Sequence, residues 1–491
     1  MAGSHVVVGK FISKFTVLRG AARELWLTFA IKLLGFAAYT VTNLTLKRWL
    51  STEFGYSDQQ ALGLVAVWSI TMTIVTLLVG ALTDAIGLRR AFFLGVWVCL
   101  LGRAVMVLAP TPGLAIALGL FPLAAGEALG TPVLVAAVRK YSTTPQRSIA
   151  FSGSYMMINI GSLVAAFLFD GVREHFGELG RWRLPGLGLE LTTYRTLFLV
   201  SFGLELLIWP LVWLIRPNVN VTDAGLKFIP PAERQAGAPG WGKISDAIAH
   251  SLRETVRITR ALFQQAGFYR LLVFLLLIAF LKLIFMQMYY VFPEFGIREL
   301  GDGAPVGKLW AINAMLIIGL VPIVGALTQR FSAYAMVMVG GVLSAASVFI
   351  MALPPAWFQP LAASAPGQWL GHYYLGLTGE VHPYYVMIAL YVVVLSFGEA
   401  FYSPRVYEYA SAIAPAGQEA SYGALSYVPF LLAKLLIGTF SGTLLARYCP
   451  AHGERHSGTM WLFVALTASI APAGLILLRK RIRAREAGRE N

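Results

Sequence analysis

Apolar runs of about 20 residues recur along almost the whole chain, with short polar segments between them. A helix of about 20 mostly apolar residues crosses the ~30 Å hydrocarbon core of a bilayer. Twelve runs are long enough, at 24–46, 61–83, 91–110, 113–138, 148–171, 194–215, 268–292, 308–328, 332–353, 383–403, 419–446 and 458–478. A polar stretch follows the sixth run. The sequence therefore predicts an all-α membrane protein whose twelve transmembrane helices form two six-helix bundles.

The composition agrees with a membrane-embedded chain. Hydrophobic residues make up 57% of the 491 residues and charged residues only 13%, whereas soluble domains average roughly 25% charged. The net charge of +15 is spread over short loops and both ends of the chain. This distribution favours a lipid bilayer over a nucleic acid as partner.

His372 and His382 lack ligand spacing with a cysteine or acidic residue, and we expect no metal and no cofactor.

Lysine and arginine are more frequent in one set of connecting segments, which includes both ends of the chain. Because such residues stay on the cytoplasmic side, we expect cytoplasmic termini and a multi-pass protein of the plasma or bacterial inner membrane. The N-terminus has no apolar core followed by a cleavage site, so we expect no removable signal peptide. We expect an N-terminal bundle (1–216), a cytoplasmic linker (217–267) and a C-terminal bundle with a basic tail (268–491).

The linker contains the segment KISDAIAHSLRETVRITRALF, in which apolar residues recur at helical spacing beside three arginines. This pattern predicts a basic amphipathic helix at the cytoplasmic membrane surface. A calmodulin-like target helix has a similar pattern and is the alternative interpretation.

Charged residues interrupt the apolar sequence between the second and third runs, in LLVGALTDAIGLRRAFFLGV (77–96). The pattern G-x-x-x-D-x-x-G-x-R-R resembles the signature loop of the major facilitator superfamily of transporters. In that family the loop braces the two halves of the protein on the cytoplasmic side in one alternating-access state. The resemblance assigns this role to Gly80, Asp84, Gly87, Arg89 and Arg90. Ala85 departs from the family, which usually has a basic residue there.

A similar segment, GALTQR, occupies 325–330, at the end of the second run of the second half. It resembles a degenerate copy of the same loop, as expected if the two halves are parallel repeats. Gln329 stands in the place of the aspartate, so we do not expect the two copies to act equally.

Three further motifs resemble those of one branch of the superfamily, the proton-dependent oligopeptide transporters. In the fifth run, FSGSYMMINIGSL resembles the family's N-x-G-S signature with one mismatch at Ser154. GEALGTP in the fourth run resembles a glycine-rich segment that ends in Lys-Pro, and GEAFYSP in the tenth resembles a Gly-Glu…Ser-Pro pattern that continues to Ala-Pro. The resemblance implies that Asn159 hydrogen-bonds a peptide backbone and that Glu399 holds an amino terminus.

Two features of that family are absent. The first run, RELWLTFAIKLLG, lacks the E-x-x-E-R motif that the family uses for proton coupling and for holding a substrate carboxylate. Thr131 replaces the lysine before the fourth-run proline. Lys32 lies two residues past the position of the missing arginine, about half a helical turn away. The chain therefore anchors its substrate differently or moves a different solute.

Ionisable residues inside a span are costly, at least ~2.5–3.5 kcal/mol each at a helix centre. Seven lie inside the predicted runs and more than three residues from either end: Lys32, Arg103, Glu127, Glu205, Lys282, Glu399 and Lys434. We interpret Arg103 and Glu205 as members of structural ion pairs. Glu127 and Lys434 fit either a structural or a functional role. The candidates for proton coupling are Glu127 and Glu399.

Residues of the first, seventh and tenth spans line the central path in the superfamily, and aromatic side chains of nearby spans can form an amphipathic wall for a ligand. On this basis the candidate substrate-binding residues are Lys32, Tyr39, Tyr155, Asn159, Lys282, Tyr289 and Glu399.

The sequence predicts a secondary active transporter that moves a small, charged or zwitterionic organic solute, with a peptide-like solute as the first guess. We expect alternating access, coupling to protons and a monomer. The alternatives are an exporter or facilitator of a different amphiphilic solute, and a non-transporting membrane sensor on the same fold. We do not expect an enzyme, because all seven histidines lie outside the spans and no nucleophile with a nearby base is visible.

Overall fold

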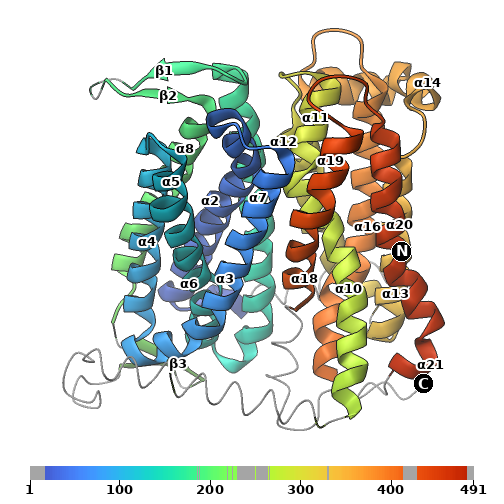
Figure 1. Ribbon diagram of the computed structural model, residues 1–491. Helices are drawn as coiled ribbons and strands as arrows, with labels where there is room; N and C mark the ends of the chain where they lie inside the picture. The colour runs from blue at the N-terminus through green and yellow to red at the C-terminus, as the bar shows by residue number, and fades with distance from the viewer. Residues whose placement is uncertain are drawn as a thin grey trace. The chain divides into compact units, whose positions relative to one another are not determined.

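The computed structural model describes residues 17–184, 186, 188–217, 219–223, 225–228, 249, 264, 266–328, 331–412 and 428–483. Helices make up most of these residues, and the strands among them form two short antiparallel hairpins (Figure 1). Eleven of the described helices are long and apolar enough to cross a membrane.

The described part of the first half contains seven α-helices and both hairpins. The helices are α2 (Arg23–Phe54), α3 (Asp58–Ile86), α4 (Leu88–Leu108), α5 (Pro112–Leu114), α6 (Phe121–Lys140), α7 (Thr144–Phe176) and α8 (Thr193–Leu214), with a 3₁₀ turn at Val17–Gly20 and a π-helical turn at Ala115–Leu120. Between α7 and α8, β1 (Arg181–Arg183) pairs with β2 (Glu190–Thr192). After α8, β3 (Val219–Thr222) pairs with β4 (Gly225–Phe228).

The regular elements in the described part of the second half are all helices. Its long helices are α10 (Ala266–Tyr290), α12 (Val306–Leu327), α13 (Ala333–Ile350), α16 (Pro383–Ala412) and α20 (Ser457–Leu477). The shorter ones are α11 (Phe292–Leu300), α14 (Gln359–Ala363), α15 (Ala365–Gln368), α18 (Val428–Leu436), α19 (Gly442–Tyr448) and α21 (Arg479–Ile482), with a 3₁₀ turn at Pro355–Phe358 and π-helical turns at Trp369–Leu375 and Ile437–Ser441.

The eleven long apolar helices correspond to eleven of the twelve predicted runs. The remaining run, 419–446, is described from Val428 onward, where α18, a π-helical turn and α19 follow one another. The predicted amphipathic helix of the linker lies outside the described residues, apart from Ala249 and Gln264. Gln329 and Arg330 of the second loop motif lie outside them as well.

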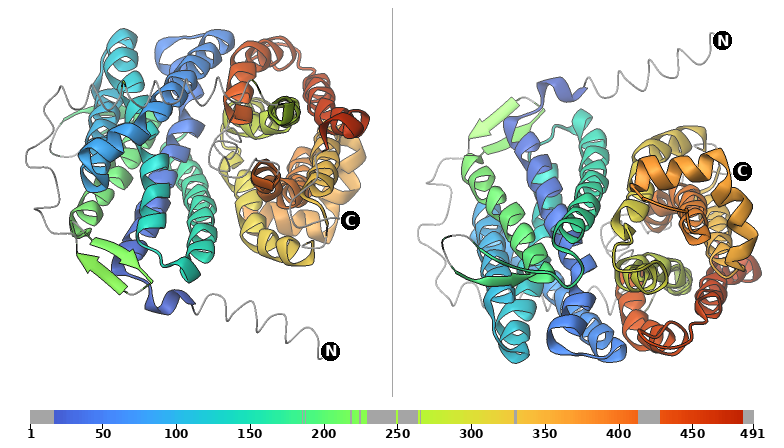
Figure 2. Two further views of the ribbon diagram at one scale, coloured as in Figure 1. Left: turned by 90° about the horizontal axis from the view of Figure 1, so that it is seen from below. Right: turned by 90° about the horizontal axis from the view of Figure 1, so that it is seen from above.

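Backbone contacts divide the chain into two compact units. Unit 1 consists of Met1–Thr42, Thr71–Val164 and Leu197–Thr255, and unit 2 of Asn43–Ile70, Ala165–Thr196 and Val256–Asn491. Unit 2 thus includes one end each of α2, α3, α7 and α8 as well as the second half. Within each unit the helices run roughly side by side, as the end-on views show (Figure 2). The predicted domain boundaries remain predictions.

Glycine lets α4 of unit 1 approach α6 and the π-helical turn before it closely. A Cβ atom at Gly102 would lie 2.9 Å from the carbonyl oxygen of Gly119, and one at Gly126 would lie 2.9 Å from a backbone nitrogen of α4. Only small residues permit such contact between helix backbones. Arg103 and Glu127 each follow one of these glycines, so their side chains start from the crossing of the two helices.

Unit 2 repeats this arrangement between α13 and α16. A Cβ atom at Gly340 would lie 2.5 Å from the carbonyl oxygen of Gly398, and one at Gly398 would lie 2.7 Å from the backbone nitrogen of Ser344. Glu399 follows Gly398 and therefore also starts from a close helix crossing.

Candidate functional site

Buried polar residues of α10, α12 and α16 come together in unit 2. The amide of Asn313 donates a hydrogen bond to Glu399 Oε2 at 3.0 Å. The Lys282 ammonium donates to Ser403 Oγ at 3.3 Å, and its Nζ lies 4.9 Å from the centre of the Tyr402 ring. Lys282 and Glu399 are 4% and 8% exposed, and their opposite charges attract each other across the site. The structure thus brings together two predicted substrate residues.

Aromatic rings lie beside this charged pair. The ring of Trp310 on α12 lies 5.8 Å from that of Tyr289 and 6.4 Å from that of Phe285, centre to centre. Phe285 in turn lies 5.6 Å from Lys282 Nζ. The indole N–H of Trp310 is buried and has no hydrogen-bond partner among the residues that the structure describes. This wall combines apolar area with a free donor, as small-molecule sites do.

The unit 1 candidates lie on α2 and α7. Lys32 is 7% exposed, and it makes no hydrogen bond or ion pair with a described residue. The Asn159 amide donates to the carbonyl oxygen of Tyr155 at 3.2 Å. A Cβ atom at Gly161 would lie 2.6 Å from the carbonyl oxygen of Leu33, so α7 packs on α2 beside Lys32. The fourth candidate, Tyr39, is half-buried on α2.

Arg103 of α4 contacts two glutamates instead of one. Its Nη1 lies 3.1 Å from Glu205 Oε2 on α8, and its Nη2 contacts Glu127 Oε1 on α6. Its Nε donates to Ser201 Oγ at 2.7 Å. Arg103 and Glu205 are thus both members of an ion pair, and Glu127 contacts the same arginine. The sequence did not predict which of the charges would pair. Ser201 was missed by sequence reasoning, because a serine in an apolar run carries no signal of its own.

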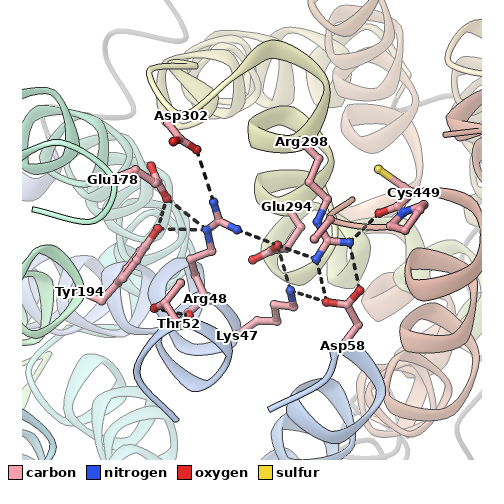
Figure 3. A network of polar contacts seen from close by, with 12 residues as sticks. Lys47, Arg48, Thr52, Asp58, Glu178, Tyr194, Glu294, Arg298, Asp302 and Cys449 are labelled. Atoms are coloured by element: carbon pink, nitrogen blue, oxygen red, sulfur yellow. Dashed lines mark hydrogen bonds and ion pairs between the residues drawn. The ribbon is translucent and has the colours of Figure 1, made fainter. Parts of the chain in front are cut away.

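A network of eight charges lies at helix ends in unit 2. Figure 3 shows the part that contains Lys47, Arg48, Asp58, Glu178, Glu294 and Arg298. The network consists of Lys47, Arg48, Arg173 and Arg298 with Asp58, Asp170, Glu178 and Glu294. These side chains are 15% exposed or less, and the four cations balance the four carboxylates. Asp302 lies 4.0 Å from Arg48 Nη2, but it is 71% exposed and is not counted in the set. We call this set the eight-charge network.

Glu294 on α11 is the centre of one part of the network. Its Oε2 lies 2.9 Å from Lys47 Nζ, 3.2 Å from Arg48 Nη1 and 3.1 Å from Arg298 Nη2. Burial raises the pKa of Glu294, but the three cations outweigh burial and hold its pKa below the usual 4.5. The carboxylate is therefore ionised at neutral pH.

Asp170 on α7 is the centre of the other part. Its carboxylate accepts hydrogen bonds from the backbone N–H groups of Gly307 and Lys308, at 2.9 and 2.6 Å. These N–H groups begin α12, where a negative charge is favourable. Arg173 ties Asp170 to Glu178, at 3.1 and 2.7 Å. Within unit 2 the network thus joins the ends of α2, α3 and α7 to α11 and α12.

The predicted brace residues lie at the junction of α3 and α4. Gly87 precedes α4 with a φ of 84°, which favours glycine. Arg89 donates from Nη2 to the carbonyl oxygen of Trp213 at 2.8 Å, in the last turn of α8, whereas Arg90 is exposed. Gly80 and Asp84 lie on α3, and their surroundings are outside the described part. The brace role remains a prediction.

One sequence signal for the two glutamates went unused. The pattern Gly-Glu-Ala-x-x-(Ser/Thr)-Pro occurs twice, at Gly126–Pro132 and at Gly398–Pro404. Both copies place the glutamate directly after a glycine that makes a close helix crossing. The repeat could have predicted that Glu127 and Glu399 occupy equivalent positions in the two halves.

Solved structures with this fold cover almost the whole chain. An auto-inhibited POT family peptide transporter has a TM-score of 0.66 and 17% identity, covering 96% of this chain and 99% of its own. A POT family transporter in complex with 5-aminolevulinic acid has a TM-score of 0.64 and 15% identity, covering 94% and 97%. The tetrameric PepTSo2 has the same TM-score and identity, covering 93% and 97%. A comparison with curated protein sequences gave no significant match.

The family model of the Major Facilitator Superfamily matches residues 28–377. Together with the eleven apolar helices and the structural likeness, this match confirms the predicted all-α transporter fold. The chain is a multi-pass integral membrane protein, and it belongs to the Major Facilitator Superfamily of transporters.

Proposed function

We propose that this protein is a proton-coupled secondary transporter that carries a small zwitterionic, peptide-like solute by alternating access. The observation that carries the proposal is the buried set of Lys282, Glu399 and Asn313, which offers opposite charges and an amide within one unit. Such a set suits a solute with an ammonium group and hydrogen-bonding amides, because a buried carboxylate favours a cationic group and a buried amide favours a hydrogen-bonding one. In this proposal Glu399 holds the amino terminus.

The solute's carboxylate is assigned to Lys32. This buried lysine has no described partner of its own, and an unpaired buried cation favours an anionic ligand. Asn159, on the helix that packs beside Lys32, is assigned to the solute's backbone. Tyr39, Tyr155 and Tyr289 are assigned to the wall of the site.

The similar structures support this class of solute. One is described as a peptide transporter, and another holds 5-aminolevulinic acid, a molecule with one amine and one carboxylic acid. A short peptide also has an amino group at one end and a carboxylic acid at the other. A solute of this kind would be matched by one carboxylate and one lysine of the candidate site.

The eight-charge network supports alternating access. It joins helix ends of the first half of the chain to α11 and α12 on the side that the lysine and arginine distribution predicts to be outside. We assign it to closure of that side, and the predicted brace at Gly80–Arg90 to closure of the cytoplasmic side in the other state. The transporter would alternate between the two closures.

A thermal-shift screen over dipeptides, tripeptides, amino acids and amphiphiles, followed by transport in proteoliposomes, tests the proposal. We expect a zwitterionic peptide to stabilise the protein and to accumulate when a pH gradient is applied. Glu399→Gln should abolish both effects, whereas Glu380→Gln, at an exposed glutamate outside the spans, should not. The proposal fails if no zwitterion stabilises the protein or if Glu399→Gln transports normally. Efflux without uptake would indicate an exporter, and binding without transport a sensor.

A further inference from the structure

The cluster of Arg103, Glu127 and Glu205 contains an unequal number of charges. One guanidinium contacts two carboxylates, and all three residues lie inside candidate spans. Their side chains are 0%, 13% and 7% exposed. With both glutamates ionised, the cluster carries one net negative charge away from water, whereas one bound proton makes it neutral.

Among the residues that the structure describes, the groups that contact this cluster supply no second cation. Ser201 of α8 accepts from Arg103 Nε at 2.7 Å and donates to the carbonyl oxygen of Ala38 on α2 at 2.8 Å. Thr42 of α2 lies 3.0 Å from the same serine hydroxyl, and the Cys99 thiol of α4 is buried beside the three charges. Lys32, the remaining cation of α2 inside the span, makes no ion pair with a described residue.

We infer that Glu127 and Glu205 bind one exchangeable proton between them, and that this pair is the proton-binding site of the transport cycle. The inference rests on the proposed function, because it takes the protein to be a proton-coupled transporter. It adds Glu205 to Glu127 as a second member of the coupling site. Two carboxylates that share one cation in a dry site readily share one proton as well.

The geometry divides the tasks within the cluster. Arg103 is a positioning residue, because Ser201 fixes its Nε and leaves Nη1 and Nη2 to face one carboxylate each. Glu127 has the larger exposed fraction of the two glutamates, so the proton enters and leaves through it. Glu205 keeps the arginine neutralised while Glu127 exchanges its proton.

Infrared difference spectra of the full-length protein in liposomes test the proton site without any solute. Between alkaline and acidic buffer we expect the C=O stretching band of a buried carboxylic acid to appear in the wild type and in Glu399→Gln. Glu127→Gln and Glu205→Gln should each lose this band. Both variants remove a negative charge and keep the side-chain shape, so folding is preserved. The inference is overturned if the band is absent from the wild type or survives in both variants.

Transport of dialanine gives the second test. The ratio of gradient-driven accumulation to counterflow should fall in Glu127→Gln and Glu205→Gln to the value measured without a pH gradient. Glu380→Gln serves as the control and should keep the wild-type ratio. An unchanged ratio in both variants overturns the coupling role even if dialanine is carried. If the wild type does not carry dialanine, the proposed function is in error for that solute, and the infrared result still decides the proton site.

Discussion

The same seven-residue pattern occurs at Gly126–Pro132 in unit 1 and at Gly398–Pro404 in unit 2. In both copies the glycine lies at a close crossing of two helices. The glutamates that follow have different partners. Glu127 contacts an arginine that Glu205 shares, whereas Glu399 accepts from the amide of Asn313.

This difference shows that the sequence pattern places the backbone of the glutamate at a helix crossing. The residues packed against its carboxylate determine whether the carboxylate can exchange a proton or hold a ligand. Glycine allows close backbone approach whatever the surrounding chemistry. A carboxylate in a charge cluster can exchange a proton with little change elsewhere, whereas a carboxylate facing an amide and a lysine can hold a ligand's ammonium group. Four predictions test the comparison.

The largest effect is expected when the arginine of the first copy is removed. Arg103→Gln leaves two buried carboxylates without their cation, which costs about 3–5 kcal/mol of unfolding free energy. Thermal unfolding of the purified variant should show this loss, and adding Glu205→Gln should recover part of it. Lys282→Gln should cost less, because it leaves Glu399 with the Asn313 hydrogen bond. If Arg103→Gln and Lys282→Gln lost the same unfolding free energy, the proposed difference between the two glutamate sites would be contradicted.

Glu294 of the eight-charge network should not titrate between neutral pH and pH 4.5. Because the pKa of Glu294 is held below its usual value of 4.5, its stabilising contribution is complete above pH 4.5 and is lost as the pH falls through the lowered pKa. Glu294→Gln should cost about 3 kcal/mol at neutral pH, and its difference from the wild type should shrink below pH 4.5. Unfolding temperatures of both proteins across this range check the prediction. A difference that changes between neutral pH and 4.5 would contradict it.

Enlarging the glycine of either copy should have similar, intermediate effects. Gly126→Val and Gly398→Val introduce atoms where a Cβ atom alone would meet backbone at 2.9 and 2.7 Å, and overpacking of this kind costs about 1–3 kcal/mol. Gly130→Ala is the matched control, because a Cβ atom there meets nothing within 4 Å. Unfolding temperatures of the three variants give the comparison. Tolerance of valine in one copy would show that only the other depends on the close crossing.

The smallest effect is expected at the loop between α3 and α4. Arg89→Ala removes a donor from the last carbonyls of α8, which costs about 0.3–1 kcal/mol. Arg90→Ala, next to it and exposed, should leave the unfolding temperature unchanged. If the two variants have the same unfolding temperature, the hydrogen bonds from Arg89 to α8 do not stabilise the protein. The predicted brace is then the one role left for Arg89.

Much of the fold could be predicted from the sequence, and less of the site. The helices followed from apolar runs, because each run is long enough by itself to span a bilayer. The buried charges were recognised individually, because each one interrupts such a run. Asn313 and Ser201 were missed, since neutral polar residues in a span give no comparable signal. The eight-charge network was missed because its residues lie at helix ends, where charged side chains are expected.

The sequence by itself determined the membrane class, the helix positions and the superfamily, because hydrophobicity, length and a loop motif are properties of short stretches of chain. Only the tertiary structure decided that Arg103 contacts both Glu127 and Glu205, and that the amide of Asn313 donates to Glu399. The energy of a charge depends on which groups lie within a few ångströms of it, and these groups come from helices far apart in the sequence. Glu127 and Glu399 belong to two copies of one motif, but different helices pack against them, and their carboxylates therefore have different partners.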